Sequence, residues 1–505
     1  MFKKNLLFKK RKKYTLTYSS FSTGMNDSVD DNILPLRYAK KLYNYTIKKG
    51  SLQCGLGIKQ LSLPKYFDDN QTFRVVGQFD ENEGIKNLWH YQFWDEANQR
   101  MNHNIIFHGE NGGLYILNSV YPMTAFPYMF PVDKYEFDGD IYGMDYRLNG
   151  KDVMIFVVPN EEKIIVCQDD LVNTIIDNAP KLLSICKHYE RLFAILEGDR
   201  KTLMFSANLD PTNWNAELDE GGFIQMYDER GKLLKLVSFN DYVYVFREFG
   251  ITKISAYGDQ EEFSVSHLAI SSTKIFPNSI TCCGDMVLFL TEDGLYRFDG
   301  YTTSKLTLNI EELFKEQNNE NCCGLFQNNK YYLACRLNFD DDQKIGCESY
   351  ENGYVNNALL EYDLASGDLN IVRGVDIKNM CVMYDFCYNK IICCFNGEYK
   401  TYFGEISASG TYFEKVLPKA WVSPYSNMGY PNQLKIIEQI IIKTLNDLKV
   451  KIKTDKEEKI YYIKGKPITQ RIKTNVRGEL VQISFISETD GEIEVSSPQI
   501  TVSVV

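Results

Sequence analysis

The residues best suited to chemistry lie near the middle of the chain, where His188 and Arg191 stand three positions apart. An imidazole can transfer protons near neutral pH, and a guanidinium can hold an anion in a fixed geometry. On a single β-strand, however, an odd separation places two side chains on opposite faces. We therefore expect His188 and Arg191 to serve packing and hydrogen bonding, and we predict no catalytic residue in the chain.

The segment from Ser206 to Trp214 loosely resembles the Asp-box of sialidases, but it departs from that motif. Asn208 stands where the box has Asp, Asp210 stands where it has Gly, and Trp214 comes one residue late. The segment also occurs once, whereas sialidases repeat the box. We expect Asp210-Pro211 to start a turn and Trp214 to pack between sheets. A glycosidase with paired carboxylates stays open as an alternative, because acids are plentiful throughout the chain.

No pattern in the sequence predicts a metal or a cofactor. Asp340-Asp341-Asp342 followed by Glu351 resembles a calcium loop, but Lys344 and Ile345 occupy the positions of a ligand and of the turn-making glycine. The five His and 13 Cys show no zinc-ligand spacing, and no Gly-rich phosphate loop is complete. Several Cys lie inside apolar runs, which is typical of a protein folded in a reducing cytoplasm.

Composition and charge narrow the class of protein further. Hydrophobic residues make up 44% of the 505 residues, and 34 Tyr and 30 Phe favour β structure. The net charge of −11 argues against tight nucleic-acid binding, yet an acidic protein could line a passage through which DNA slides. No apolar run is long enough to span a membrane or to form a secretory signal.

The first 13 residues carry seven Lys or Arg and no acid. Such a basic segment is typical of a solvated chain end or of a segment that contacts a partner. We expect contact with a neighbouring protein to involve Lys9, Lys10, Arg11, Lys12 and Lys13.

Residues 81–418 repeat one pattern, in which a short apolar run follows a polar turn. Asn240-Asp241 precedes Tyr242–Phe246, Glu292-Asp293-Gly294 precedes Leu295–Phe298, and Asn328-Asn329 precedes Lys330–Cys335. Units of this kind, each of several strands, predict a β-propeller of about six or seven blades. Two β-sandwiches are the structural alternative.

Two further regions flank the repeats, so the chain is predicted to be all-β with three parts. Residues 1–80 form an N-terminal arm and entry segment. Residues 419–505 form a small domain that resembles a β-sandwich. Within it, the stretch from Leu434 to Leu448 fits either an amphipathic helix or a strand rich in β-branched residues.

An ordered series of motifs resembles the packaged-DNA stabilisation and tail-nozzle proteins of short-tailed bacterial viruses. The series covers nearly the whole chain: Gly24, Asn26, Leu34, Ala39, Asn44 and Gly50, then Ala179-Pro180, His188, Arg191-Leu192-Phe193, Ser206, Asp210-Pro211, Trp214, Phe239, Asp241, Val245-Phe246, Gly250-Ile251 and Ile254, and finally Trp421, Gln433-Leu434-Lys435 and Arg477–Gln482.

This resemblance implies a non-enzymatic virion protein, made in the cytoplasm of the bacterial host and placed in the tail below the portal. It would retain packaged DNA and guide its ejection, letting duplex DNA pass without tight binding. The expected partners are other tail proteins (portal, adaptor, tail fibres or needle) and further copies of the chain in a hexameric ring. A propeller adaptor that carries receptor-binding fibres is the alternative.

Overall fold

The computed structural model describes residues 12–17, 21, 24–31, 33–61, 65–67, 73–75, 84–118, 128–168, 171–216, 221–384 and 389–505. These residues form β-strands, turns and short 3-10 helices, with no α-helix among them. The predicted all-β class is therefore confirmed. The 3-10 helices are η1 (Pro159–Glu161), η3 (Gln260–Glu262), η4 (Glu311–Leu313), η5 (Gly346–Ser349) and η6 (Gly397–Tyr399).

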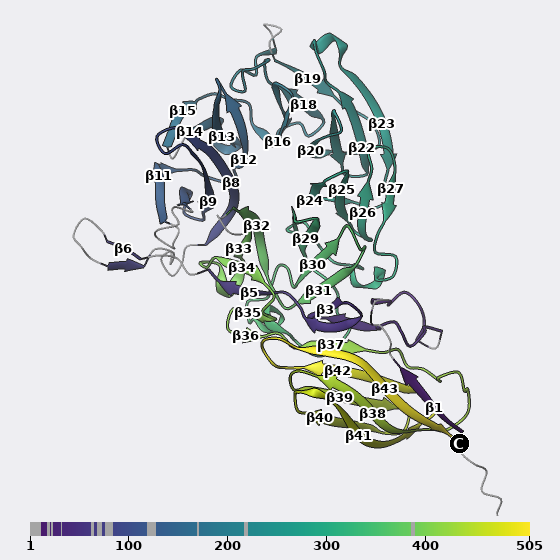
Figure 1. Ribbon diagram of the computed structural model, residues 1–505. Helices are drawn as coiled ribbons and strands as arrows, with labels where there is room; N and C mark the ends of the chain where they lie inside the picture. The colour runs from purple at the N-terminus through teal and green to yellow at the C-terminus, as the bar shows by residue number, and fades with distance from the viewer. Residues whose placement is uncertain are drawn as a thin grey trace, which may run out of the picture.

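Antiparallel sheets follow one another along the chain and surround a common centre (Figure 1), as in a β-propeller. The first three contain β8 (Ile85–Asp95), β9 (Arg100–Gly109), β10 (Gly113–Asn118) and β11 (Tyr128–Glu136); β12 (Tyr142–Leu148), β13 (Lys151–Val158), β14 (Lys163–Gln168) and β15 (Leu171–Ile176); and β16 (Leu182–His188), β17 (Arg191–Leu196), β18 (Thr202–Phe205) and β19 (Gly222–Gln225).

The next three sheets have the same order of strands. They contain β20 (Leu233–Phe239), β21 (Tyr242–Arg247), β22 (Gly250–Ser255) and β23 (Ser264–Ile270); β24 (Ile275–Cys283), β25 (Met286–Thr291), β26 (Gly294–Phe298) and β27 (Thr303–Lys305); and β28 (Cys323–Gln327), β29 (Lys330–Cys335), β30 (Ala358–Asp363) and β31 (Leu369–Arg373).

The last sheet of the ring is built from both halves of the chain. Its strands, in spatial order, are β32 (Ile377–Met383), β33 (Lys390–Phe395), β34 (Gly404–Ser407), β5 (Gly57–Gln60), β35 (Thr411–Tyr412) and β36 (Lys415–Val416). The first strands of consecutive sheets contact each other around the centre, and β32 contacts β8, so the ring is closed.

Local chemistry explains why the sheets of the ring form. Their second strands are near-continuous apolar runs; β13, for example, is buried from Val153 to Val158. Such strands pack against a neighbouring sheet on both faces. Turns at Asn240-Asp241 and Asn328-Asn329 have positive φ at both central residues, the geometry that tight hairpins require and that Asn and Asp tolerate.

Two further sheets share one apolar core below the ring (Figure 1). One has the order β3 (Tyr45–Lys48), β4 (Ser51–Cys54), β43 (Glu494–Val504), β38 (Lys435–Thr444) and β41 (Lys466–Gly478), with β1 (Lys12–Thr17) also paired to β43. The other has the order β2 (Lys41–Tyr43), β37 (Lys419–Val422), β42 (Val481–Ser487), β39 (Leu448–Thr454) and β40 (Glu458–Ile463).

The stretch from Leu434 to Leu448, which fitted a helix or a strand, contains strand β38 and the start of β39. On β39, Leu448, Val450 and Ile452 are buried in the shared core, and the intervening lysines face outward. This alternation matches a sheet with one solvated face.

The predicted N-terminal arm contributes strands to several sheets. Strands β1 to β4 belong to the two sheets below the ring, and β5 belongs to the ring itself. A small separate pair consists of β6 (Lys65–Phe67) and β7 (Phe73–Val75). The described residues up to Gln60 thus connect the ring to the C-terminal sheets.

Candidate functional site

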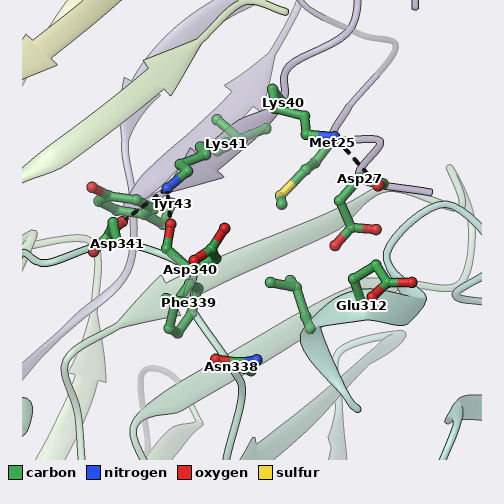
Figure 2. Close-up of a pocket in the computed structure, with 12 residues that line it drawn as sticks. Met25, Asp27, Lys40, Lys41, Tyr43, Glu312, Asn338, Phe339, Asp340 and Asp341 are labelled. Atoms are coloured by element: carbon green, nitrogen blue, oxygen red, sulfur yellow. Dashed lines mark hydrogen bonds and ion pairs between the residues drawn. The ribbon is translucent and has the colours of Figure 1, made fainter. Parts of the chain in front are cut away.

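Charged side chains surround a cavity at the junction between the ring and the C-terminal sheets. Here Met25, Asp27 and residues 40–43 of the N-terminal segment lie against η4 and residues 338–341 of the ring, and the two sides enclose a cavity of about 300 Å³ (Figure 2). We call this space the junction pocket. It is lined by Met25, Asp27, Lys40, Lys41, Leu42, Tyr43, Glu312, Leu313, Asn338, Phe339, Asp340 and Asp341.

Arg373 anchors the ring side of the junction. Its side chain is 2% exposed, and its guanidinium donates paired hydrogen bonds to Asp341 at 2.9 and 3.0 Å. It also donates to Glu348, with Nη2 2.8 Å from Oε2. Both pairs are charge-assisted, which makes them stronger than neutral hydrogen bonds.

Aromatic rings complete the surroundings of this guanidinium. It lies 4.3 Å from the ring centre of Phe339 and 5.1 Å from that of Tyr43. Lys41 hydrogen-bonds the backbone oxygen of Asp340 and lies 3.4 Å from the carboxylate of Asp341. In the acidic run that resembled a calcium loop, the carboxylate of Asp341 therefore binds Arg373 through both oxygens and also lies close to Lys41.

Asn44 fastens the N-terminal segment to both larger parts. Its side-chain oxygen accepts the backbone N–H of Arg373 at 2.7 Å, and its side-chain nitrogen donates to the oxygen of Pro418 at 2.7 Å. Its own N–H donates to the oxygen of Ile371 at 2.8 Å. Asn44 is fully buried with φ of 60°, a conformation that Asn adopts more readily than most residues.

Asp27 has the most perturbed carboxyl group in the junction pocket. Burial raises its pKa to about 6, although the positive charge of Lys40 opposes the shift. Its N–H donates to the oxygen of Asn309 at 2.8 Å, so the residue is held against the ring. The carboxylate of Glu312 lines the same pocket (Figure 2) and disfavours a second negative charge.

His188 and Arg191 come together in a way that the spacing argument missed. They lie on two strands, β16 and β17, and pair directly across the two-residue turn Tyr189-Glu190. Directly opposed residues point to the same face of a sheet, so the expectation of opposite faces was wrong. Tyr189-Glu190 lacks the Gly, Asn or Pro that marks most turns.

Both side chains hold neighbouring segments together. His188 Nδ1 lies 2.9 Å from the hydroxyl of Ser238 on β20, and burial lowers the pKa of His188. Arg191 donates to the backbone oxygen of Ser206 at 2.8 Å and lies over the ring of Phe205. They line a surface pocket with the exposed Tyr189 and Tyr257, which make an edge-on contact.

The segment around Asp210 is a turn. The carboxylate of Asp210 accepts the backbone N–H of Thr212 at 3.0 Å, and the indole N–H of Trp214 donates to the oxygen of Pro211 at 3.0 Å. The ring of Trp214 is buried in a core cluster shared by the β12–β15 and β16–β19 sheets. Trp214 thus lies between two sheets of the ring.

Gly250 begins β22, where a side chain would not fit. A Cβ at this position would meet the backbone oxygen of Ala269 and the side chain of Arg230. The glycine is therefore needed for the close approach of β22 and β23.

The basic N-terminal residues fall partly outside the described part of the chain. Lys9, Lys10 and Arg11 lie outside the described residues. Lys12 and Lys13 open β1, which pairs with β43, and Lys13 forms an ion pair with Glu438 at 2.8 Å. Lys13 is thus engaged within the C-terminal domain, and a contact of this segment with another protein stays a prediction.

The described cysteines are all free thiols. Burial raises the pKa of Cys283 to about 12 and that of Cys393 well above its usual value. Such thiols are protonated and unreactive at neutral pH, as expected of small apolar core residues. Among the described residues, no helix is long and apolar enough to cross a membrane.

Sequence reasoning missed the junction. Arg373 comes 32 positions after Asp341 and 25 after Glu348, and no local motif marks them as partners. Asn44 appeared among the motif residues and Asp341 in the acidic run, and these were the available signals.

Comparisons with known proteins give fold likenesses alone. No family model and no curated protein matches the chain. Similar solved structures include BamB from Moraxella catarrhalis, with 12% identity over 69% of this chain and 97% of that chain and a TM-score of 0.35. Another is the extracellular domain of a hybrid two-component system protein from B. thetaiotaomicron, with 13% identity over 91% of this chain and 63% of that chain and a TM-score of 0.42. These likenesses are too weak to indicate a function for this chain.

Proposed function

We propose that the chain is a structural, non-enzymatic protein of a short-tailed bacterial virus, a part of the tail channel below the portal that retains packaged DNA and guides its ejection. The proposal rests on the ordered series of motifs between Gly24 and Gln482. A structural role is supported by the positions that these motif residues occupy in the fold.

The observation that carries the proposal is that motif residues bind separate segments together. Asn44 connects the N-terminal strands to β31 and to Pro418. His188 connects the β16–β19 and β20–β23 sheets through Ser238, and Trp214 fills the core between the β12–β15 and β16–β19 sheets. A part that conducts DNA under pressure needs this kind of rigid connection.

At finer detail, we infer a propeller of seven blades, the upper value expected from the sequence, and a β-sandwich as the C-terminal domain. Seven sheets of at least four strands make up the closed ring in the described residues. The two sheets below the ring share one apolar core, as the layers of a sandwich do.

Charge distribution supports assembly of copies into a ring. Between Lys449 and Arg477 the chain has ten Lys or Arg and three acids, although the whole chain carries −11. This segment forms most of β39, β40 and β41 at the lower end of the molecule (Figure 1). The rest of the chain is correspondingly acidic, so the basic end of one copy can meet an acidic surface of the next.

Such a contact joins two different surfaces and closes into a ring under cyclic symmetry. Arg471 and Lys473 on β41 are exposed, and neither forms an ion pair within the described part of the chain. We expect them to contribute to the contact between copies, in a hexamer that attaches to the portal and to other tail proteins.

The decisive experiment is an electron cryomicroscopy reconstruction of virus particles produced by a host that expresses the chain with a small fused label. The label is expected in a ring between the portal and the distal tail. A label on peripheral fibres would favour the adaptor instead. A label absent from particles, or release of reducing sugar from host polysaccharide by the purified chain, would refute the proposal.

A further inference from the structure

The centre of the ring holds a polar cavity of about 510 Å³ that the proposed function does not use. We call it the central cavity. Residues of the innermost strands β8, β12, β20, β24, β28 and β32 line it. Its volume lies in the range of small-molecule sites, which is about 300–1,000 Å³.

Three lysines from three separate sheets line the central cavity: Lys86 on β8, Lys235 on β20 and Lys378 on β32. Asp140 is the carboxylate among the described lining residues. The cavity thus has an excess of positive charge inside a protein whose net charge is −11.

A repeated motif positions two of these lysines. Ile85-Lys86-Asn87-Leu88 and Ile377-Lys378-Asn379-Met380 open neighbouring strands, β8 and β32. In each, the ladder shifts register at the lysine, so Lys86 and Lys378 are the extra residues of β-bulges. Bulges of this kind re-aim a side chain.

The asparagine of each motif stabilises its bulge in the same way. The side-chain oxygen of Asn87 accepts the N–H of Leu88 at 2.9 Å, and that of Asn379 accepts the N–H of Met380 at 2.7 Å. The two asparagines also hydrogen-bond each other across the strands. The two bulges form one structure that presents two lysines to the cavity.

Of the three lysines, Lys378 alone has a carboxylate partner among the described residues. Lys378 lies 3.5 Å from Glu110, while Lys86 donates to the oxygen of Gly139 at 3.3 Å. Lys235 donates to the oxygen of Ile280 at 2.9 Å and forms no ion pair within the described residues, and burial lowers its pKa, although the nearby cysteines oppose the shift. A buried ammonium without an opposite charge is unfavourable, so an anion in the cavity would stabilise the fold.

We propose that the central cavity binds a small oxyanion of the phosphate class, held by Lys86, Lys235 and Lys378. An ammonium group binds phosphate oxygens as a compact charge with three donors. The amide side chains of Asn278, Asn321 and Asn396 also line the cavity and can serve a phosphate with further hydrogen bonds.

The test is titration of the full-length chain with pyrophosphate by calorimetry, at ionic strength held constant with sodium chloride. Saturable binding of one pyrophosphate per chain is expected. Lys235→Met and Lys378→Met, which keep the length of the side chain and remove the charge, are each expected to weaken binding at least tenfold. Lys449→Met, on the outer face of β39, is the matched control and is expected to leave the affinity unchanged.

Circular dichroism and a thermal melt establish that each variant folds. Lys235→Met without ligand is expected to melt at the same or a higher temperature, because it removes an uncompensated charge. No saturable binding of pyrophosphate, or equal binding by the wild type and both cavity variants, would overturn the proposal. Binding of a 5′-phosphorylated oligonucleotide that pyrophosphate does not displace would assign phosphate recognition to another surface and would also overturn it.

Discussion

Replacement of Asn44 by alanine tests whether one buried side chain joins the three parts of the molecule. Asn44→Ala removes two side-chain hydrogen bonds and leaves the N–H of Arg373 and the oxygen of Pro418 buried without these partners. Each unsatisfied group costs about 1–3 kcal/mol. Alanine at a positive φ adds about 1 kcal/mol of backbone strain. The expected loss of stability is therefore about 3–7 kcal/mol.

The assay is urea unfolding followed by tyrosine and tryptophan fluorescence, together with hydrogen exchange of the N–H of Arg373. Asn44→Gly removes the same hydrogen bonds and tolerates positive φ, so it is expected to lose about 1 kcal/mol less than Asn44→Ala. Exchange at Arg373 is expected to accelerate in both variants. A loss below about 1 kcal/mol for Asn44→Ala, with unchanged exchange, would refute the conclusion that Asn44 holds the junction together.

Four further outcomes are expected. The native state retains a proton on Asp27 up to pH about 6, whereas the unfolded state loses it near pH 3.8. This group therefore makes the free energy of unfolding fall as pH rises between these values. Asp27→Asn should remove that slope from urea midpoints measured between pH 4 and 7. Trp214→Ala should lower the free energy of unfolding, measured in urea, by about 3–5 kcal/mol. Tyr462→Ala should leave it almost unchanged, because the Tyr462 side chain is 80% exposed. Gly250→Ala should lower the melting temperature by several degrees, whereas Gly198→Ala, with open space at its Cβ, should leave it unchanged or raise it slightly. In the proposed ring, the paired change of Arg471 and Lys473 to Glu should shift sedimentation toward monomers, while the same change at the exposed Lys151 and Lys181 should not; unaltered rings would contradict the charge argument.

The sequence predicted those features of the fold that arise locally. Turns at Asn240-Asp241 and Asn328-Asn329 were identifiable because Asn and Asp tolerate the positive φ that the hairpin requires. The stretch from Leu434 to Leu448 was ambiguous because its β-branched residues also have a helical period. Its cross-strand partners on β41 and β43, which settle the strand, lie elsewhere in the sequence.

The junction and the central cavity depend on contacts between distant residues. Asn44 and Arg373 are separated by 329 positions. Lys86 and Lys378 share the motif Ile-Lys-Asn, but the two copies are too short and too far apart to indicate a common site without the closed ring. His188 and Arg191 were misplaced because their turn carries no turn-forming residue, and a spacing argument that assumes a single strand fails at such a turn.

Strand β5 lies between β34 and β35, so residues 57–60 complete a sheet whose other strands come from residues 377–416. Residues 57–60 are synthesised several hundred residues before β34 and β35, the strands with which they pair, so β5 can enter the sheet only late in synthesis. Strand β36, which ends at Val416, pairs with β35, and β35 pairs in turn with β5. Because β5 follows strands that are held at Asn44 and in the C-terminal sheets, both halves of the chain fix this sheet. A pull on either half of the chain would therefore load β34, β5 and β35 together.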